Sequence, residues 1–429
     1  MNDLEKKLKE ISQSILPKYV KNFDNFKEGD FVQYSGQFWD DKEIFAALDS
    51  FLNGNLITAG EKVAQFQNKF SCKYNVKYSH MVNSGSSANL VMMAVLKKQF
   101  KWNDGDEIIV SPVGFPTTIS SIVQNNLTPI FIDIEFNSLN FDVSLIESKI
   151  NSKTKAIFVS PVLGNPPDMD FIKNICDKHN LLLIGDNCDS LGTLWNNNLI
   201  TNLYYSWTTS FYPAHHISCG EGGMISSNNK EFIKEARSVS WWGRDCYCVG
   251  ANNMLECGTC GNRFDKWLED YDGIIDHKYI FTNVGYNLKP LDFQGAIGIA
   301  QLDKVDYIDL KRREYKDRIQ KYIEDNIKEV IVINSTKNSN PSWFGVPIYC
   351  ENQNVKDRLV SHFEKNKIQT RNYFAGNILM HPAYKYLDDY KNYPNSNLVL
   401  SNAFFIGCSP LYNDLVLDYI EKVCKKWNQ

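Results

Sequence analysis

A chain of 429 residues is longer than one ordinary domain, so we expect one large unit and a smaller one. Hydrophobic residues make up 43% and charged residues 22% of the chain, and its formal net charge is -4, which indicates a globular protein without a nucleic-acid-binding surface. The first residues lack the apolar core of a signal peptide, and no run of about 20 apolar residues occurs. We therefore expect a cytoplasmic chain without membrane spans.

Seven short apolar segments alternate with helix-like stretches, which predicts an α/β fold with a mostly parallel sheet covered on both faces. The expected strands are 80–83, 107–111, 129–134, 156–160, 181–185, 204–208 and 223–226. A long helical stretch over 292–328 follows, and then further strands and helices, which predicts a smaller C-terminal α+β domain. We divide the chain into a large domain, residues 1–310, and a small domain, residues 311–429.

A turn rich in serine and glycine follows the first expected strand and reads Asn-Ser-Gly-Ser-Ser-Ala-Asn over 83–89. The helical pattern begins at Ala88. Backbone N–H groups and hydroxyls at a helix N-terminus attract an anion, so Gly85 and Ser86 are candidates for binding a phosphate. Taken alone, the motif also fits a simple helix N-cap.

Two later strands end in side chains suited to an aromatic cofactor. Phe115 follows the second strand, and its ring would fit flat against a pyridine ring, although an aromatic residue here also fits an ordinary core position. Asp186 follows the strand over 181–185. A buried aspartate needs a cationic partner, and a protonated pyridine nitrogen is such a partner.

The stretch 204–227 organises the rest of the chain. An apolar strand leads into Ser-Phe-Tyr-Pro-Ala-His-His over 210–216, and Glu-Gly-Gly follows at 221–223. Such a turn between two strands presents a catalytic side chain to a cofactor, and the residue presented here is His215. No lysine lies between Asn198 and Lys230.

Together these motifs resemble the DegT-type sugar aminotransferases, which are fold-type-I pyridoxal-phosphate enzymes and read Ser-Phe-x-x-x-Lys, then Glu-Gly-Gly, at this turn. The resemblance implies a fold-type-I PLP-dependent transferase fold, with His215 where the family keeps its Schiff-base lysine. Imidazole moves protons but forms no Schiff base, so transamination should be crippled. With histidine at this position, the sequence resembles the 3-dehydrases of the family, which remove the 3-hydroxyl of nucleotide-linked 4-keto-6-deoxyhexoses.

The resemblance also implies roles for other residues. The predicted cofactor-binding residues are Gly85, Ser86, Phe115, Asp186, Asp189, Ser210 and Asn287. The last belongs to a Gly-Tyr-Asn-Leu stretch over 285–288 that reaches the phosphate of a neighbouring subunit in the family, so we expect a homodimer. The predicted substrate-side residues, in the small domain, are Arg371, Asn377 and His381.

Eleven cysteines without an export signal indicate reduced thiols or metal ligation rather than disulfides. Between Cys188 and Cys246 lie 57 residues, and between Cys246 and Cys248 lies one. This spacing resembles family members that carry a [2Fe-2S] cluster, with Cys260, before Gly-Asn-Arg-Phe, as the fourth ligand. The 11 residues between Cys248 and Cys260 depart from the family's shorter spacing, and Cys257 is the alternative ligand.

A tetrahedral zinc site, or a set of cysteines without a metal, is the alternative to the cluster. Cys188 follows the predicted pyridine-binding Asp186 by two positions, which brings the metal close to the cofactor. A purely structural zinc would not require that proximity, so the placement favours the iron-sulfur cluster.

The resemblance implies an enzyme that uses non-covalently held pyridoxamine 5′-phosphate (PMP). His215 acts as the base, the expected substrate is CDP-linked, and the product feeds 3,6-dideoxyhexose synthesis. Electrons come through the cluster from an NAD(P)H-dependent flavin/iron-sulfur reductase or a ferredoxin. Three readings stay open beside it: a nucleotide-sugar aminotransferase, a cluster-free glutamate-dependent 3-dehydratase of the colitose-pathway type, and a non-enzymatic cofactor- or metal-binding protein.

Overall fold

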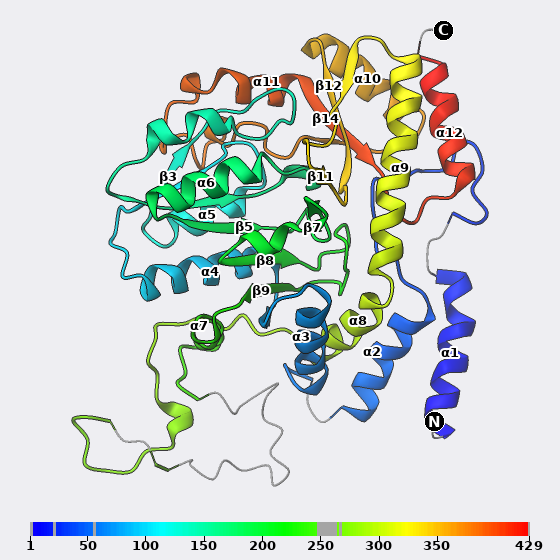
Figure 1. The fold of residues 1–429 in the computed structure, drawn as a ribbon. Coiled ribbons are helices and arrows are strands. Elements are labelled where there is room, and N and C mark those ends of the chain that lie inside the picture. Colours follow the sequence, from blue (N-terminus) through cyan, green and yellow to red (C-terminus); the bar gives the residue numbers. More distant parts are fainter. Residues whose placement is uncertain (1–2, 20–22, 55–56, 247–263, 266–267, 428–429) are drawn as a thin grey trace.

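The computed structural model describes residues 3–19, 23–54, 57–246, 264–265 and 268–427. A large sheet lies between two layers of helices, and a smaller sheet packs against the long helix α9 (Val305–Asn326) along one side of the molecule (Figure 1). The fold is the predicted α/β arrangement with a large, mostly parallel sheet.

The large sheet has seven strands in the order β1-β9-β8-β5-β4-β2-β3. Their bounds are β1 Tyr78–Val82, β2 Glu107–Val110, β3 Thr128–Phe131, β4 Thr154–Val159, β5 Leu182–Asp186, β8 Ser206–Ser210 and β9 Gly223–Ser227. The strands β3, β2, β4, β5 and β8 pair in parallel, and β9 runs antiparallel to both β1 and β8. All seven predicted strands are confirmed.

The β8 strand starts and ends two residues later than the apolar pattern predicts. Residues Ile200–Leu203 form a short 3-10 helix, so the strand begins only at Ser206. Thr208, Thr209 and Ser210 are buried strand residues. Because their side chains carry hydroxyl groups, a search for hydrophobic residues does not include them in the strand.

Alternate residues of the parallel strands face opposite helix layers, as the pleat of a strand requires. On one face, Ile109 and Ile157 share a core with α3 (Glu61–Lys73), α6 (Met169–His179) and α8 (Asp292–Leu302). On the other, Ile108 and Phe158 share a core with α4 (Gly85–Gln99), α5 (Pro116–Val123) and α7 (Lys230–Ser240). This two-sided burial explains the nearly continuous apolar runs of the strands.

The smaller sheet is antiparallel, in the order β10-β12-β14-β13. Its elements and the helices that share its core are β10 Val330–Val332, β12 Gly345–Cys350, β13 Thr370–Asn372, β14 Ala403–Gly407, α9, α10 Gln353–Lys365 and α12 Asp414–Lys425. The division at residue 310 stays a prediction, because α9 spans it. This helix gives Val305 to the core of the large sheet and Ile319 to that of the small sheet.

The remaining α-helices and strands lie at the periphery. They are α1 Asp3–Tyr19, α2 Asp41–Asn53, α11 Pro394–Asn402 and a three-stranded sheet of β6 Leu194–Trp195, β7 Asn198–Leu199 and β11 Ser339–Asn340. The described residues between α7 and α8 project from the body of the molecule beside α7 (Figure 1). Among the helices that the structure describes, none is long and apolar enough to cross a membrane.

Candidate active site

The predicted phosphate turn, the loop after β5 and the end of β8 meet at Gly85. A Cβ atom on this glycine would lie 2.6 Å from Cβ of Ser210 and 2.9 Å from Sγ of Cys188, so a larger residue does not fit. Helix α4 begins at Gly85 rather than at Ala88, and Ser84 caps it by accepting a hydrogen bond from the Ser87 N–H at 3.1 Å. Capping and anion binding are therefore compatible at this helix N-terminus.

Ser86 occupies the first turn of α4 and is exposed, with its hydroxyl 3.2 Å from Oγ1 of Thr117. Ser210 is buried at the end of β8, and its hydroxyl accepts a hydrogen bond from the Tyr212 N–H at 3.3 Å. The three residues predicted to bind phosphate are thus brought to one place by α4 and β8.

Asp186 is buried and held by neutral donors. Its Oδ2 accepts hydrogen bonds from Asn89 Nδ2 and Thr118 Oγ1, both at 2.7 Å, and its Oδ1 accepts one from the Cys188 N–H at 3.2 Å. Within the described part of the chain, no lysine, arginine or histidine forms an ion pair with this carboxylate. A buried carboxylate in this state is a ready partner for a cation from outside the chain.

Asn89 and Thr118 were not among the predicted site residues. Both are buried, at 0% and 3% exposure, on helices that otherwise turn apolar side chains to the sheet. A polar residue on the apolar face of a helix was the signal that would have identified them, because a buried polar group needs a hydrogen-bond partner.

Phe115 ends the loop before α5 and is 52% exposed, so it is not a core residue. Its ring centre lies 6.2 Å from that of Phe374, in an edge-to-face arrangement. About half of the side chain is therefore accessible to a ligand, as stacking on a cofactor would require.

His215 is largely buried. Its side chain is 14% exposed, its Nδ1 is 3.7 Å from Oδ1 of Asp189, and its ring centre is 5.2 Å from that of Phe344. Burial, helped by the charge of Arg312, lowers the pKa of His215 to about 3, so the imidazole is neutral at neutral pH. A neutral imidazole is the form that accepts a proton.

Asp189 lies beside this imidazole. Its Oδ2 accepts a hydrogen bond from the Leu163 N–H at 3.3 Å. Burial and the neighbouring Asp186 raise the pKa of Asp189 to about 7. The adjacent His216 is buried and shares a 2.8 Å hydrogen bond between its Nε2 and the Ser342 carbonyl.

Arg312 holds the backbone of the histidine turn. This arginine of α9 is fully buried and donates to the carbonyls of Ala214, His215, Trp343 and Phe344 at 3.0, 3.4, 3.0 and 3.1 Å. It was absent from the predicted site, although it stands in an apolar stripe with Ile308, Tyr315 and Ile319. An arginine in such a stripe is the signal that sequence reasoning missed.

Only part of the predicted cysteine set lies within the described residues. Cys188 is placed beside Gly85, and burial together with Asp186 and Asp189 raises the pKa of its thiol well above the usual range. Cys246 is also buried. Cys248, Cys257 and Cys260 lie outside the described residues, and among those described no group of three or more potential metal ligands occurs.

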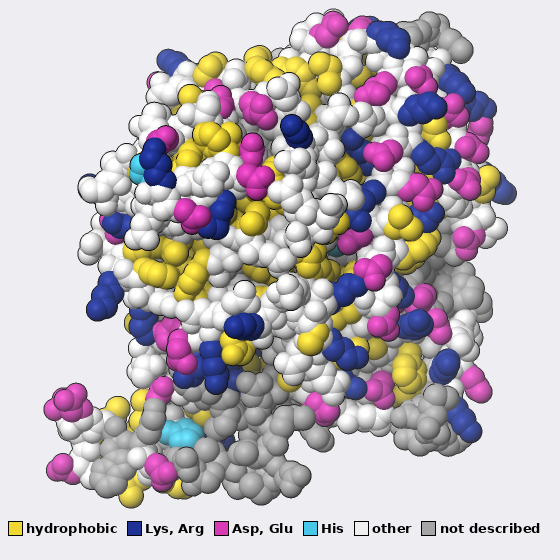
Figure 2. Space-filling view, viewed as in Figure 1, with side chains coloured by type: hydrophobic (Ala, Val, Ile, Leu, Met, Phe, Trp, Pro, Cys, Tyr) yellow, Lys and Arg dark blue, Asp and Glu magenta, His cyan; other side chains and the backbone are white. Residues whose placement is uncertain are grey.

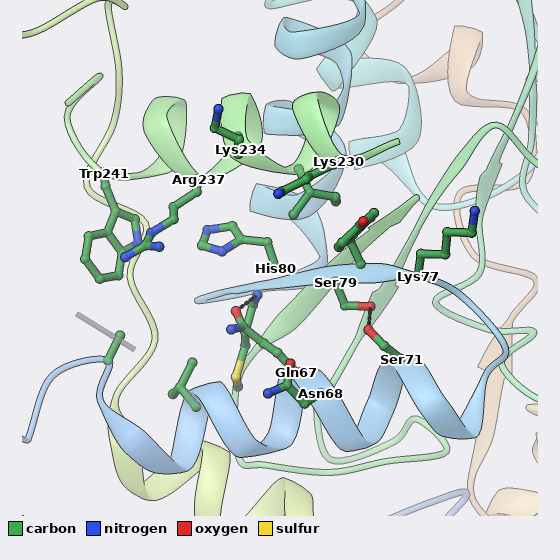
Figure 3. Close-up of a pocket in the computed structure, with 15 residues that line it drawn as sticks. Gln67, Asn68, Ser71, Lys77, Ser79, His80, Lys230, Lys234, Arg237 and Trp241 are labelled. Atoms are coloured by element: carbon green, nitrogen blue, oxygen red, sulfur yellow. Dashed lines mark hydrogen bonds between the residues drawn. The ribbon is translucent and has the colours of Figure 1, made fainter. Parts of the chain in front are cut away.

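Asn287 lies on the segment that returns from the projection to α8, and it is exposed. Its backbone pairs with Trp241, and the carbonyl of the next residue, Leu288, accepts a hydrogen bond from the Asn83 N–H at 2.9 Å. Trp241 also lines a hollow of 360 Å³ between α3 and α7 (Figure 3). The hollow lies beside β1, which is the edge strand of the large sheet. None of the predicted site residues lines that hollow.

The three predicted substrate-side residues differ in accessibility. Arg371 is exposed, and its guanidinium carbon lies 4.6 Å from the ring centre of Tyr34. Asn377 is fully buried, where it accepts from the Leu379 N–H at 2.9 Å and donates to Asn397 at 2.8 Å. His381 is partly buried, with Nε2 2.8 Å from the Ala375 carbonyl. Of the three, Arg371 has the side chain most open to a ligand.

Residues 39–428 match the model of the DegT/DnrJ/EryC1/StrS aminotransferase family. The chain belongs to this family. The family predicted from the sequence motifs is thereby confirmed, and the DegT-type fold accounts for the seven-stranded sheet whose strand ends carry the site.

Curated relatives within the family include sugar 3-dehydratases. The dTDP-4-dehydro-2,6-dideoxy-D-glucose 3-dehydratase of Saccharopolyspora spinosa is 35% identical over 91% of this chain and 85% of its own. The lipopolysaccharide biosynthesis protein RfbH of Salmonella typhimurium is also 35% identical, over 91% of this chain and 90% of its own.

Solved structures agree in fold. The GDP-4-keto-6-deoxy-D-mannose-3-dehydratase of E. coli, solved with bound hydrated PLP, superposes with a TM-score of 0.81 at 29% identity, covering 92% of this chain and 99% of that one. A histidine-to-asparagine mutant of GDP-4-keto-6-deoxymannose-3-dehydratase with bound GDP-perosamine gives the same TM-score and identity, covering 92% and 100%.

Proposed function

We propose that this chain is a PMP-dependent 3-dehydratase that removes the 3-hydroxyl of a nucleotide-linked 4-keto-6-deoxyhexose, with CDP as the expected nucleotide. The observation that carries the proposal is a neutral, nearly buried His215 at the turn where the family otherwise presents a lysine. The 3-dehydratase names of similar family members support the same reaction class. An aminotransferase is disfavoured because the turn offers no primary amine.

The site residues fit a pyridoxamine phosphate cofactor. The Asp186 carboxylate, buried without an ion pair, would hold the protonated pyridine nitrogen. Gly85 and Ser86 at the start of α4, with Ser210, would hold the phosphate, and the accessible part of Phe115 would cover the ring. When bound, this cofactor supplies an amino group for the sugar ketone and a ring that accepts electrons.

His215 would serve as the base that moves the proton. Its side chain is largely buried from water, and its low pKa keeps it able to accept a proton at neutral pH. Asp189, 3.7 Å from Nδ1, would stabilise the imidazolium that results. Arg312 fixes the backbone on which this imidazole is carried.

Loss of the 3-hydroxyl leaves the sugar two electrons short of a 3-deoxy ketone. Pyridoxamine phosphate could supply this pair only by being consumed to pyridoxal phosphate, so repeated turnover requires a reductant or an amino donor that restores the cofactor. We propose a [2Fe-2S] cluster on Cys188, Cys246, Cys248 and Cys260, with Cys257 as the alternative fourth ligand, and a separate flavin/iron-sulfur reductase or ferredoxin as its electron source. Cys188 supports this assignment because its sulfur lies beside Gly85 of the cofactor turn. A cluster there would supply electrons one at a time.

Two measurements test the cluster. Anaerobically purified protein should contain iron and acid-labile sulfide. Cys248→Ser should lose the visible absorbance of the cluster and stop deoxygenation, while proton exchange at the C4′ carbon of bound pyridoxamine phosphate persists. Unchanged formation of 3-deoxy sugar by Cys248→Ser, with the same reductase, would contradict the proposal.

A cluster-free, glutamate-dependent 3-dehydratase is the second candidate. A GDP-4-keto-6-deoxymannose-3-dehydratase solved with a trapped PLP-glutamate geminal diamine is 28% identical to this chain, with a TM-score of 0.80. Deoxygenation that needs glutamate but no reductase would select this second function.

We further propose a homodimer in which Asn287 of one protomer completes the phosphate site of its partner. The projecting segment exposes large apolar side chains in succession, with Tyr279 59%, Phe281 52% and Val284 101% exposed. A run of exposed apolar residues indicates an interface, and active sites commonly lie at subunit boundaries.

A further inference from the structure

The hollow of 360 Å³ between α3 and α7 is lined by positive side chains. Among the described residues, no aspartate or glutamate lines it. Its cationic lining residues are Lys77, Lys230, Lys234 and Arg237. They are spread along the hollow, from Lys77 at one end to Arg237 and Trp241 at the other (Figure 3). A concave site lined by charge of one sign attracts an anion.

Lys77 and Lys230 carry charges that the chain does not neutralise. Both residues are exposed, and neither forms an ion pair with a carboxylate of the described residues. Lys234 instead pairs with Glu231 at 3.0 Å. The two unpaired ammonium groups are therefore open to a ligand.

The other end of the hollow is buried and holds Arg237 and Trp241. Arg237 is 8% exposed, and its guanidinium carbon lies 5.0 Å from the ring centre of Trp241. The indole N–H of Trp241 is buried and has no hydrogen-bond acceptor within the described part of the chain. A buried donor without an acceptor costs about 1–3 kcal/mol, so an acceptor oxygen that reaches this end is favoured.

Gln67 adds a donor whose orientation the edge strand fixes. Its Oε1 accepts a hydrogen bond from the Met81 N–H of β1 at 2.8 Å (Figure 3). Its Nε2 group is therefore left to donate, and it bonds to no other described residue. The apolar side chains of Val63, Met81 and Ile233 also line the hollow, which suits the organic part of a ligand.

We infer that this hollow binds a phosphorylated small molecule, with Lys77, Lys230 and Arg237 as its cationic contacts. Phosphate oxygens accept several charge-assisted hydrogen bonds, which matches ammonium, guanidinium, amide and indole donors spread along one site. The volume lies within the range of about 300–1,000 Å³ found for small-molecule sites. Inorganic pyrophosphate and the diphosphate of a nucleotide share this chemistry. The inference is independent of the proposed function, because no residue of the histidine site lines the hollow.

Calorimetric titration of the full-length protein, loaded with pyridoxamine phosphate, tests the inference with inorganic pyrophosphate and CDP as probes. The double variant Lys77→Gln, Lys230→Gln should weaken the binding of pyrophosphate at least about ten-fold, as expected for the loss of charge-assisted hydrogen bonds. Gln67→Leu should weaken it by a smaller factor, because it removes a neutral donor. Binding at the histidine site is retained in these variants and is thereby separated from binding in the hollow.

The matched control is the double variant Lys173→Gln, Lys178→Gln. It also removes two lysines, which lie on α6 outside the hollow and pair with Asp177 and Glu147. Its affinity for pyrophosphate should equal that of the unaltered protein.

The two probes distinguish the sources of the phosphate. Tighter binding of CDP than of pyrophosphate, lost in the variant Lys77→Gln, Lys230→Gln, supports the inference with a nucleotide as ligand. Equal binding of both probes, lost in the same variant, supports it with the inorganic anion. Unchanged affinity of this variant for pyrophosphate would overturn the inference, as would failure of the unaltered protein to bind pyrophosphate. Failure of the proposed function would leave these titrations unaffected.

Discussion

The strand ends of the large sheet and the projecting segment over 268–290 differ in how far their side chains find partners within the same chain. At the strand ends, Asp186 receives three hydrogen bonds from its own chain, and Gly85 packs directly against Ser210. The projection instead exposes Tyr279, Phe281 and Val284. Figure 2 shows it standing out from the body, with acidic side chains at its tip and lysine and arginine side chains gathered near α7.

The difference has a physical origin. Parallel strands bury both faces under helices, so the polar groups at their ends must find partners inside the chain. The projection is joined to the body by backbone hydrogen bonds, such as Tyr286 N–H to the Val239 carbonyl at 2.7 Å, and by side-chain contacts, such as Asn283 Nδ2 to Ser238 Oγ at 2.8 Å. The polar groups at the strand ends therefore find hydrogen-bond partners within one chain, whereas the projection leaves large apolar side chains exposed, as the proposed homodimer interface requires.

The largest expected effect is at the site beside the strand ends. His215→Asn should lower the rate of dehydration by about three orders of magnitude, because it removes the proposed general base. Binding of pyridoxamine phosphate should stay nearly unchanged, since Asp186, Gly85 and Ser210 are intact. Turnover at the original rate, measured with a nucleotide-linked 4-keto-6-deoxyhexose, would exclude His215 as the base.

Arg312→Met should lower the free energy of unfolding by about 3 kcal/mol, because it removes a charged donor from four carbonyl groups, of which only those of Ala214 and Trp343 keep a second side-chain donor among the described residues. Urea denaturation followed by circular dichroism measures the change. Arg318→Met is the control on the same helix, since Arg318 is partly exposed and pairs with Asp414 at the surface. If the two variants lose equal stability, the contacts of Arg312 are not what stabilises the turn.

His80 connects the two regions, because its Nε2 lies 2.8 Å from Oγ of Ser240, where α7 ends and the projection begins. Burial, with a smaller effect of Arg237, lowers the pKa of His80 to about 3. Below the unfolded-state pKa, near 6.5, the unfolded chain binds a proton that the folded chain does not, so stability falls as the pH falls toward 3. One pKa unit corresponds to about 1.4 kcal/mol, so this residue should cost about 2 kcal/mol between pH 6.5 and pH 5.

Unfolding free energies of the unaltered protein and of His80→Gln, measured over this pH range, isolate that contribution. The variant should lose less stability on acidification. Parallel curves for the two proteins would show that His80 titrates normally in the folded chain.

The smallest effect is expected from Asn287→Ala, about ten-fold in activity, as for the loss of one hydrogen bond to a charged group. Mixing these chains with inactive His215→Asn chains should restore activity to about a quarter of the original, because half of the dimers are mixed and each has one intact site. Mixed dimers that form but show no such gain would indicate that each site is built from one chain.

Residues adjacent in the chain were the ones that the sequence could identify. The seven strands follow from apolar runs that two helix layers bury, and Gly85, Phe115, Asp186 and His215 each follow a strand. Because these strands run in parallel, their C-terminal ends meet at one edge of the sheet, which made a common site predictable.

Periodicity and local motifs thus determined the fold class and the list of candidate side chains, since both depend on residues close together in the sequence. Only the tertiary structure revealed Asn89 and Thr118 at Asp186, Arg312 beneath the histidine turn and Tyr34 under Arg371. Each of these contacts joins residues at least 68 positions apart, as for Thr118 and Asp186. No local pattern records such a pair, because the packing of distant elements alone decides which buried polar groups become partners.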